Sequence, residues 1–225
     1  MMPERTELRR INTVIFDMDG TVLDTLDDLA DSVNYVLRKF GMPERPREDY
    51  RQFFGSGIRH ALRCAVPPQV SDDFIDGMIP VFKEYYDLHC LDRTKPYAGI
   101  PELMAELRKQ GYQMAIVSNK IDSAVKALNQ RFFSDFVSVA VGEKPGIRRK
   151  PAPDTVLAAL AELGASADEA VCIGDSEVDL ETAENAGLPC IAVLWGFRDR
   201  DFLADRGANV FAETPEEVLS LLKPE

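Results

Sequence analysis

Short apolar runs alternate with longer amphipathic segments along most of this 225-residue chain. The apolar runs predict strands at Thr13–Phe16, Gln113–Val117, Phe136–Val141, Ala170–Ile173, Cys190–Val193 and Asn209–Phe211. The amphipathic segments predict helices at Pro101–Gln110, Ser123–Arg131, Pro153–Leu163, Asp179–Ala186 and Thr214–Leu222. Such an alternation of strands and helices is typical of a parallel sheet that is covered by helices on both faces.

One interval, between residues 24 and 96, breaks this alternation because it contains no pattern of a buried strand. It predicts four helical segments instead, at Leu26–Phe40, Pro46–Phe54, Ile58–Ala65 and Ser71–Cys90. The first of these repeats apolar residues with a period close to 3.6, as an amphipathic helix does. We therefore expect an α/β core domain with a Rossmann-like parallel sheet (residues 1–23 and 97–225). A small all-helical cap domain (residues 24–96) is then inserted after the first strand.

The charge of the chain limits its partners. The 26 Lys and Arg residues oppose 38 Asp and Glu residues, which gives a net charge of −12. Because an acidic protein repels polyanions, we expect no nucleic-acid partner, whereas a small phosphorylated ligand needs only local positive charge.

Sequence features also bear on location. The first ten residues contain no apolar leader, and no apolar run is long enough to span a membrane. The four cysteines have no spacing typical of a metal site and are Cys64, Cys90, Cys172 and Cys190. We expect a cytoplasmic protein without a membrane partner.

Polar segments follow four of the predicted strands. They are Asp17-Met18-Asp19-Gly20-Thr21, Ser118-Asn119-Lys120, Lys150-Pro151-Ala152-Pro153 and Gly174-Asp175-Ser176-Glu177-Val178-Asp179. Each has a simpler interpretation on its own, such as a turn, a helix cap or a solvated loop. Their shared position at the carboxyl ends of strands, where parallel sheets bind ligands, favours one functional site.

The residue types in these segments indicate the chemistry. Asp17, Asp19 and Asp175 would bring three carboxyl groups together, and like charges are unfavourable unless a cation compensates them. Mg²⁺ prefers oxygen ligands and binds a few carboxylates together with a substrate phosphate. With Lys150 also present, the site would attract a phosphate, whose oxygens the Ser118 hydroxyl and nearby backbone N–H groups can bind.

In this order, D-x-D-G-T, S-N, K-P-x-P and G-D-S-x-x-D resemble the motifs of the haloacid dehalogenase superfamily of phosphotransferases, from Val14 to about Phe197. The helical insert lies where that superfamily carries a cap. Within it, Phe54–Ile58, the S-N-K form of the second motif and Trp195–Arg198 most resemble the phosphoglycolate phosphatases. The resemblance implies a Mg²⁺-dependent phosphomonoester hydrolase that acts through an aspartyl-phosphate on a small phosphorylated metabolite, with 2-phosphoglycolate as the expected substrate.

The resemblance also implies roles for individual residues. Asp17 would be the nucleophile, and Asp19 the general acid toward the leaving alcohol and then the general base for water. Ser118 and Asn119 would bind the phosphoryl group, and Lys150 would neutralise its charge and that of the nucleophile. The two aspartates face the same way because side chains two apart on a strand share one side.

The expected metal ligands are Asp17, the backbone carbonyl of Asp19 and Asp175. Asp179 would lie beyond the direct ligands or reach Mg²⁺ through water. These assignments again follow from the resemblance of the motifs.

The cap would close over the site and read the leaving group. Gly55–Gly57 resembles the specificity loop of the superfamily, and Arg59 or His60 after it could meet a substrate carboxylate. An equally good interpretation is that Arg59 and His60 are exposed helix residues that do not contact the substrate.

Other functions make different demands on these residues. A mutase of the β-phosphoglucomutase type resembles D-T-x-x-x-H after the first strand, whereas Asp24–Leu29 of this chain ends in Leu. A dehalogenase does not need Asp19, and a non-catalytic module that binds Mg²⁺ and phosphate does not need its proton transfer either. Phosphatases for pyrophosphate, a nucleotide or a sugar phosphate stay open.

Overall fold

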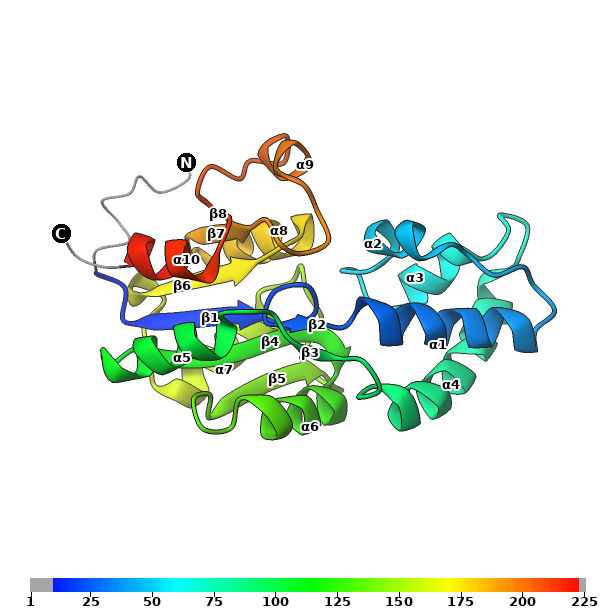
Figure 1. Ribbon diagram of the computed structural model, residues 1–225, viewed down its shortest axis with the longest axis horizontal. Helices are drawn as coiled ribbons and strands as arrows, with labels where there is room; N and C mark the ends of the chain where they lie inside the picture. The colour runs from blue at the N-terminus through cyan, green and yellow to red at the C-terminus, as the bar shows by residue number, and fades with distance from the viewer. Residues whose placement is uncertain (1–9, 223–225) are drawn as a thin grey trace.

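The computed structural model describes residues 10–222, so the expected lack of an N-terminal leader concerns residues that lie mainly outside this range. A six-stranded sheet forms the centre of the core, with the strand order β5-β4-β1-β6-β7-β8 and parallel pairing throughout (Figure 1). Its strands are β1 (Thr13–Asp17), β4 (Gln113–Ile121), β5 (Val139–Glu143), β6 (Ala170–Gly174), β7 (Cys190–Val193) and β8 (Phe211–Ala212). The predicted parallel α/β fold is confirmed.

Helices cover both faces of this sheet (Figure 1). They are α5 (Ile100–Lys109), α6 (Asp122–Phe132), α7 (Asp154–Leu163), α8 (Glu177–Ala186), α9 (Arg200–Ala204) and α10 (Pro215–Leu222). Helices α5, α6 and α10 contribute to one apolar cluster, and α7, α8 and α9 to the other. Along β1, Val14 and Phe16 belong to the first cluster and Ile15 to the second, because successive strand residues point to opposite faces.

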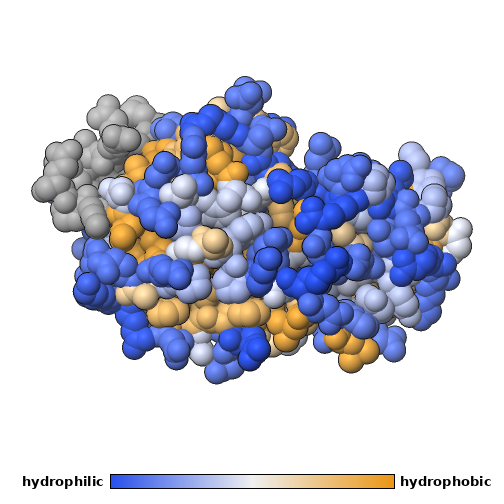
Figure 2. Space-filling model, in the orientation of Figure 1, coloured by the Kyte–Doolittle hydropathy of each residue, from blue (hydrophilic) through white to orange (hydrophobic). Residues whose placement is uncertain are grey.

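Four helices form a separate lobe beyond the carboxyl end of β1 (Figure 1). They are α1 (Leu26–Lys39), α2 (Tyr50–Phe53), α3 (Ile58–Ala65) and α4 (Asp72–His89), and a short 3-10 turn, Arg47–Asp49, precedes α2. The lobe has an apolar cluster of its own, with Val33, Tyr50 and Leu62 fully buried. Its visible surface is mostly hydrophilic, as expected of helices that bury only one side (Figure 2).

A short antiparallel ribbon connects the two parts. It pairs β2 (Leu23–Asp24) with β3 (Lys95–Pro96) and was not predicted, because two-residue strands have no recognisable pattern. The ribbon lies beside the boundaries that the sequence suggests, residues 24 and 96. We keep the division into core and cap domains at those residues as a proposal.

Strands β4, β5 and β8 differ by two or more residues from their predicted bounds, and β8 covers Phe211–Ala212 instead of Asn209–Phe211. Strand β5 begins at Val139 instead of Phe136, because Phe136 and Val137 donate backbone hydrogen bonds to the carbonyl of Phe133 in a turn after α6. Strand β4 continues past its apolar run as far as Ile121, which places the polar S-N-K residues on a strand. Among residues 10–222, no helix is both long and apolar enough to cross a membrane.

Candidate active site

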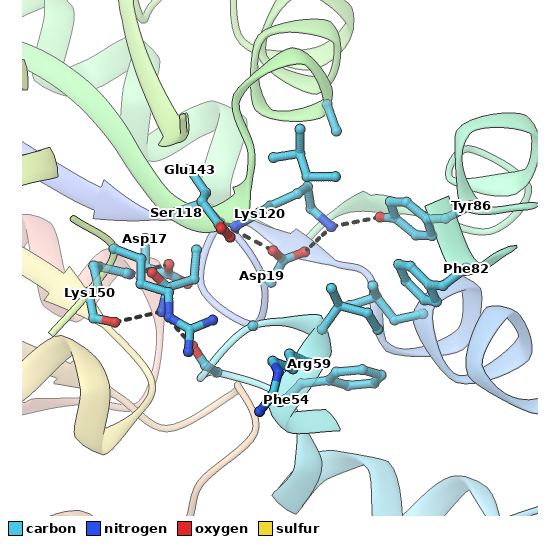
Figure 3. A pocket seen from close by; sticks show the side chains of 18 of the residues that line it. Asp17, Asp19, Phe54, Arg59, Phe82, Tyr86, Ser118, Lys120, Glu143 and Lys150 are labelled. Atoms are coloured by element: carbon cyan, nitrogen blue, oxygen red, sulfur yellow. Dashed lines mark hydrogen bonds and ion pairs between the residues drawn. The ribbon is translucent and has the colours of Figure 1, made fainter. Parts of the chain in front are cut away.

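The predicted site residues of the core meet at the carboxyl ends of β1, β4 and β6, and Figure 3 shows Asp17, Asp19, Ser118 and Lys150 around one site. A cavity of about 220 Å³ lies there between the two parts of the protein. Its lining includes Asp17, Asp19, Ser118, Lys150 and Asp175. Residues from four separate polar segments therefore surround one small space.

Lys150 links two of the carboxylates. Its buried Nζ atom donates hydrogen bonds to Asp17 Oδ1 and to Asp179 Oδ1, both at 2.6 Å. Burial lowers the pKa of Lys150, but the two carboxylates outweigh this effect, and the net pKa lies above the ordinary lysine value. Lys150 is therefore charged at neutral pH and compensates one of the negative charges.

Three buried aspartates nevertheless share this one lysine. Carboxylate oxygens of Asp17, Asp175 and Asp179 lie within 4.8 Å of one another. Burial raises the pKa of Asp17 well above its usual range against the opposing effect of Lys150, and the neighbouring carboxylates raise it further. Burial and the charge of Asp179 raise the pKa of Asp175 to about 7. The cluster thus favours binding of a proton or another cation.

The Asp175 carboxylate is held from both sides. Thr21 Oγ1 donates to its Oδ1 atom at 2.9 Å, and the backbone N–H of Phe197 donates to Oδ2 at 2.6 Å. Two glycines leave room for it, since a Cβ atom at Gly20 or Gly196 would lie 2.4 Å from Oδ2. Gly20 also has a φ of +93°, a conformation that other residues rarely adopt.

Asp179 is both a site residue and a helix cap. Its Oδ2 atom accepts hydrogen bonds from the backbone N–H and the hydroxyl of Ser176, and the bond from the backbone N–H is one half of the capping box of α8. Its Oδ1 atom accepts the bond from Lys150. Asp179 is therefore rigidly placed, and most of its lone pairs are used by the protein.

Asp19 lies beside Ser118 and Lys120 (Figure 3). Ser118 Oγ donates to Asp19 Oδ2 at 3.3 Å, and Lys120 Nζ lies 3.1 Å from Asp19 Oδ1. Lys120 also donates to the hydroxyl of Tyr86 on α4 at 2.7 Å. The sequence motifs predicted no role for Lys120. The alternation along a strand, which puts Lys120 on the same side as Ser118, was the signal that could have found it.

Asn119 contacts two loops through its side chain. Nδ2 donates to the backbone carbonyls of Gly55 in the helical lobe and of Lys150, at 3.1 and 3.0 Å. Asn119 lines the cavity, but its amide donors bind these carbonyls. Its expected contact with phosphate stays a prediction.

The two expected cap residues lie in different surroundings. Arg59 lines the cavity, while its guanidinium group is ion-paired with Asp76 at 2.6 Å and with Asp72 at 3.4 Å. His60 does not line the cavity, and its exposed ring lies 3.4 Å from Cys64 Sγ. Their roles in specificity also stay predictions.

Arg198 connects the two parts of the protein behind the cavity. Its guanidinium group pairs with Glu177 of the core at 2.8 Å. It also donates to the carbonyls of Phe54, at 3.0 Å, and of Arg51 in the helical lobe. Because Arg198 is only 8% exposed, these contacts are shielded from water and help to hold the helical lobe against the core.

Sequence comparisons agree with this geometry. The family model for haloacid dehalogenase-like hydrolases matches residues 14–193. A phosphoglycolate phosphatase from Mesorhizobium japonicum is 33% identical, over 83% of this chain and 84% of its own length. An N-acetylmuramic acid 6-phosphate phosphatase from Pseudomonas aeruginosa is 30% identical, over 95% of both chains. Relatives of similar identity thus act on different substrates.

A solved structure matches nearly the whole fold. It is a candidate phosphoglycolate phosphatase from Lactobacillus delbrueckii subsp. bulgaricus, with a TM-score of 0.90 and 38% sequence identity. The match covers 95% of this chain and 99% of the other. Both the core and the helical lobe therefore have counterparts in that protein.

Proposed function

Because the chain belongs to the haloacid dehalogenase-like hydrolase family, we propose that it is a Mg²⁺-dependent phosphatase of small phosphomonoesters. The observation that carries this proposal is the arrangement around Asp17. Its carboxylate lies against a buried lysine and two further carboxylates, and it lines one cavity with Asp19 and Ser118. A nucleophile, a proton donor and a phosphate ligand are thus available together.

The carboxylate cluster fits Mg²⁺. All its donors are oxygens, and the raised pKa of Asp175 indicates that the cluster lacks enough positive charge of its own. Asp17, Asp175 and the backbone carbonyl of Asp19 would hold the ion, and Asp179, whose oxygens are largely engaged, would reach it through water. When bound, Mg²⁺ supplies positive charge that stabilises the phosphate and the charge developing during transfer.

The residues then divide the reaction between them. A carboxylate oxygen of Asp17 attacks phosphorus, the bond from phosphorus to the ester oxygen breaks, and Asp19 gives its proton to the departing alcohol. Asp19 next takes a proton from a water molecule that attacks the aspartyl-phosphate. This second step releases inorganic phosphate and restores Asp17. Lys150 and Ser118 bind the oxygens of the phosphoryl group throughout.

Among substrates, we favour 2-phosphoglycolate. The cavity of about 220 Å³ is smaller than the ~300–1,000 Å³ typical of sites for drug-sized ligands, which favours a short alcohol. Relatives that are phosphoglycolate phosphatases support this choice. A pyrophosphatase from Bacillus cereus, 28% identical, makes pyrophosphate the second candidate.

Release of phosphate from 4-nitrophenyl phosphate, with Mg²⁺ or with a chelator, tests the proposed reaction. We expect turnover that requires Mg²⁺ and is abolished in Asp17→Asn, while Asp135→Asn at an exposed position of the core serves as the matched control. A folded wild-type protein without such activity would indicate a module that only binds Mg²⁺ and phosphate. A panel of phosphorylated metabolites, ranked by kcat/KM, then tests the substrate.

A further inference from the structure

One buried cation of the cavity has no part in the reaction described above. Lys120, on β4, lines the cavity together with Asp17 and Asp19, and its side chain is only 7% exposed. Burying an ammonium group is costly unless partners compensate it. Because Lys120 is buried, it does not serve to keep the protein surface hydrophilic, and its position indicates a role inside the cavity.

Two oxygen atoms of the protein lie close to this ammonium group. Asp19 Oδ1 lies 3.1 Å from Nζ in an ion pair, and the Tyr86 hydroxyl accepts a hydrogen bond from Nζ at 2.7 Å (Figure 3). Among residues 10–222 the structure shows no third acceptor for Nζ. One donor of Lys120 is thus available to a ligand in the cavity.

The other cations of the cavity are placed differently. Lys150 is shared by Asp17 and Asp179. Arg59 is directed to Asp72 and Asp76, which do not line the cavity, and its side chain is 40% exposed. The remaining two, Lys83 and Arg149, are exposed. Among the cations of the cavity in the described part of the chain, Lys120 alone is both shielded from water and paired with Asp19.

The location of Lys120 relative to Asp19 defines what it can bind. Asp19 must lie within hydrogen-bonding distance of the ester oxygen in order to protonate it. Lys120, 3.1 Å from the same carboxylate, then lies beside the first atoms of the leaving group. An anionic group attached next to the ester oxygen would come within its reach.

We propose that Lys120 determines specificity by binding an anionic group next to the ester oxygen, either a carboxylate or a second phosphate. This inference rests on the proposed phosphatase function and names its substrate class. Lys120 would bind the leaving group, while Lys150 binds the phosphoryl group that is transferred.

Part of the cavity wall is apolar. Leu29, Ile79 and Phe82 of the helical lobe line the same cavity, and Leu29 and Phe82 are buried. Polar side chains line it as well, among them Lys83, Asp87 and Glu143, so the discrimination that we propose depends on Lys120 and not on the wall as a whole.

A matched pair of esters tests this inference. Isobutyl phosphate has the same arrangement of heavy atoms as 2-phosphoglycolate in its leaving group, with two methyl groups in place of the carboxylate oxygens. For the wild-type enzyme we expect kcat/KM to be at least about tenfold higher for 2-phosphoglycolate. In Lys120→Met we expect this preference to fall about 10–100-fold, because the charged hydrogen bond is lost while the length of the side chain is kept.

Controls separate the alternatives. Lys83→Met and Arg149→Met should keep the wild-type preference, and its loss in either variant but not in Lys120→Met would overturn the inference. Equal losses for both esters in Lys120→Met would show that Lys120 acts only through Asp19, which also overturns it. Lys120→Arg, which keeps the charge, should retain part of the preference.

Two further outcomes are measured on the wild-type enzyme alone, so they test the inference even if Lys120→Met does not fold. A wild-type ratio near one for the two esters contradicts the inference, while hydrolysis of 4-nitrophenyl phosphate still supports the phosphatase function. Absence of all three activities contradicts both. Pyrophosphate is the third arm, since a parallel dependence on Lys120 for pyrophosphate and for 2-phosphoglycolate would show that the site accepts a second phosphate as well as a carboxylate.

Discussion

Binding of Mg²⁺ should depend strongly on pH, because protons compete for the same carboxylates. Asp175 has a pKa of about 7 in the protein without metal, as a result of burial and the charge of Asp179. Its proton must leave before the oxygen can serve as a ligand. At pH 5.5, Asp175 is almost fully protonated, so the apparent affinity for Mg²⁺ should be about 30-fold weaker than at pH 8. The raised pKa of Asp17 makes the dependence steeper.

The chain carries a suitable probe for this measurement. Trp195 is its single tryptophan, and Nε1 of its indole donates to the carbonyl of Thr21 at 2.9 Å. Thr21 in turn donates its hydroxyl to Asp175. We therefore expect Mg²⁺ titrations followed by tryptophan fluorescence to report binding at each pH. Asp175→Asn should remove most of the affinity and most of the pH dependence. Equal wild-type affinities at pH 5.5 and pH 8 would refute the assignment of Asp175 as a ligand.

Three further predictions concern the same framework. Gly20→Ala should weaken Mg²⁺ binding more than tenfold, because its Cβ would collide with Asp175. Gly111→Ala is the control, since Gly111 has a similar φ of +87° but open space around it, and we expect a lower melting temperature with unchanged Mg²⁺ affinity. Arg198→Met should lower the free energy of unfolding by about 2–4 kcal/mol in denaturant titrations, since Glu177 and two backbone carbonyls lose their partner. It should also raise hydrogen exchange in α2, and unchanged exchange there would contradict a role of Arg198 in holding the helical lobe. Without metal, the melting temperature should fall as the pH rises from about 4 to about 7, because the folded state holds the Asp175 proton more tightly than the unfolded state does. In Asp175→Asn this decline of the melting temperature with pH should be smaller.

The sequence predicts the core well because the core depends on local patterns. The apolar runs of β1 and β6 are buried in full, and the polar residues after them meet because parallel strands end at one edge. Helix α9 was not predicted, since five residues are too few to show a helical period.

Contacts between the core and the helical lobe were beyond prediction. The pair of Lys120 and Tyr86 joins residues 34 apart in the sequence, and it forms only because α4 is placed over the end of β4. The same is true of Arg198, which reaches the carbonyl of Phe54 across 144 residues. No local pattern encodes how two independently packed units meet, and it is at that junction that we propose substrate specificity to be determined.

The central claim is that Asp17 forms a covalent aspartyl-phosphate. Borohydride reduces such an acyl phosphate to homoserine, which peptide mass spectrometry can locate. Asp19→Asn with Mg²⁺ and 4-nitrophenyl phosphate should accumulate the intermediate, since this leaving group needs no proton while the attack of water needs a base. We predict homoserine at position 17 and at no other aspartate. Release of 4-nitrophenol by Asp19→Asn without any homoserine at position 17 would contradict the mechanism.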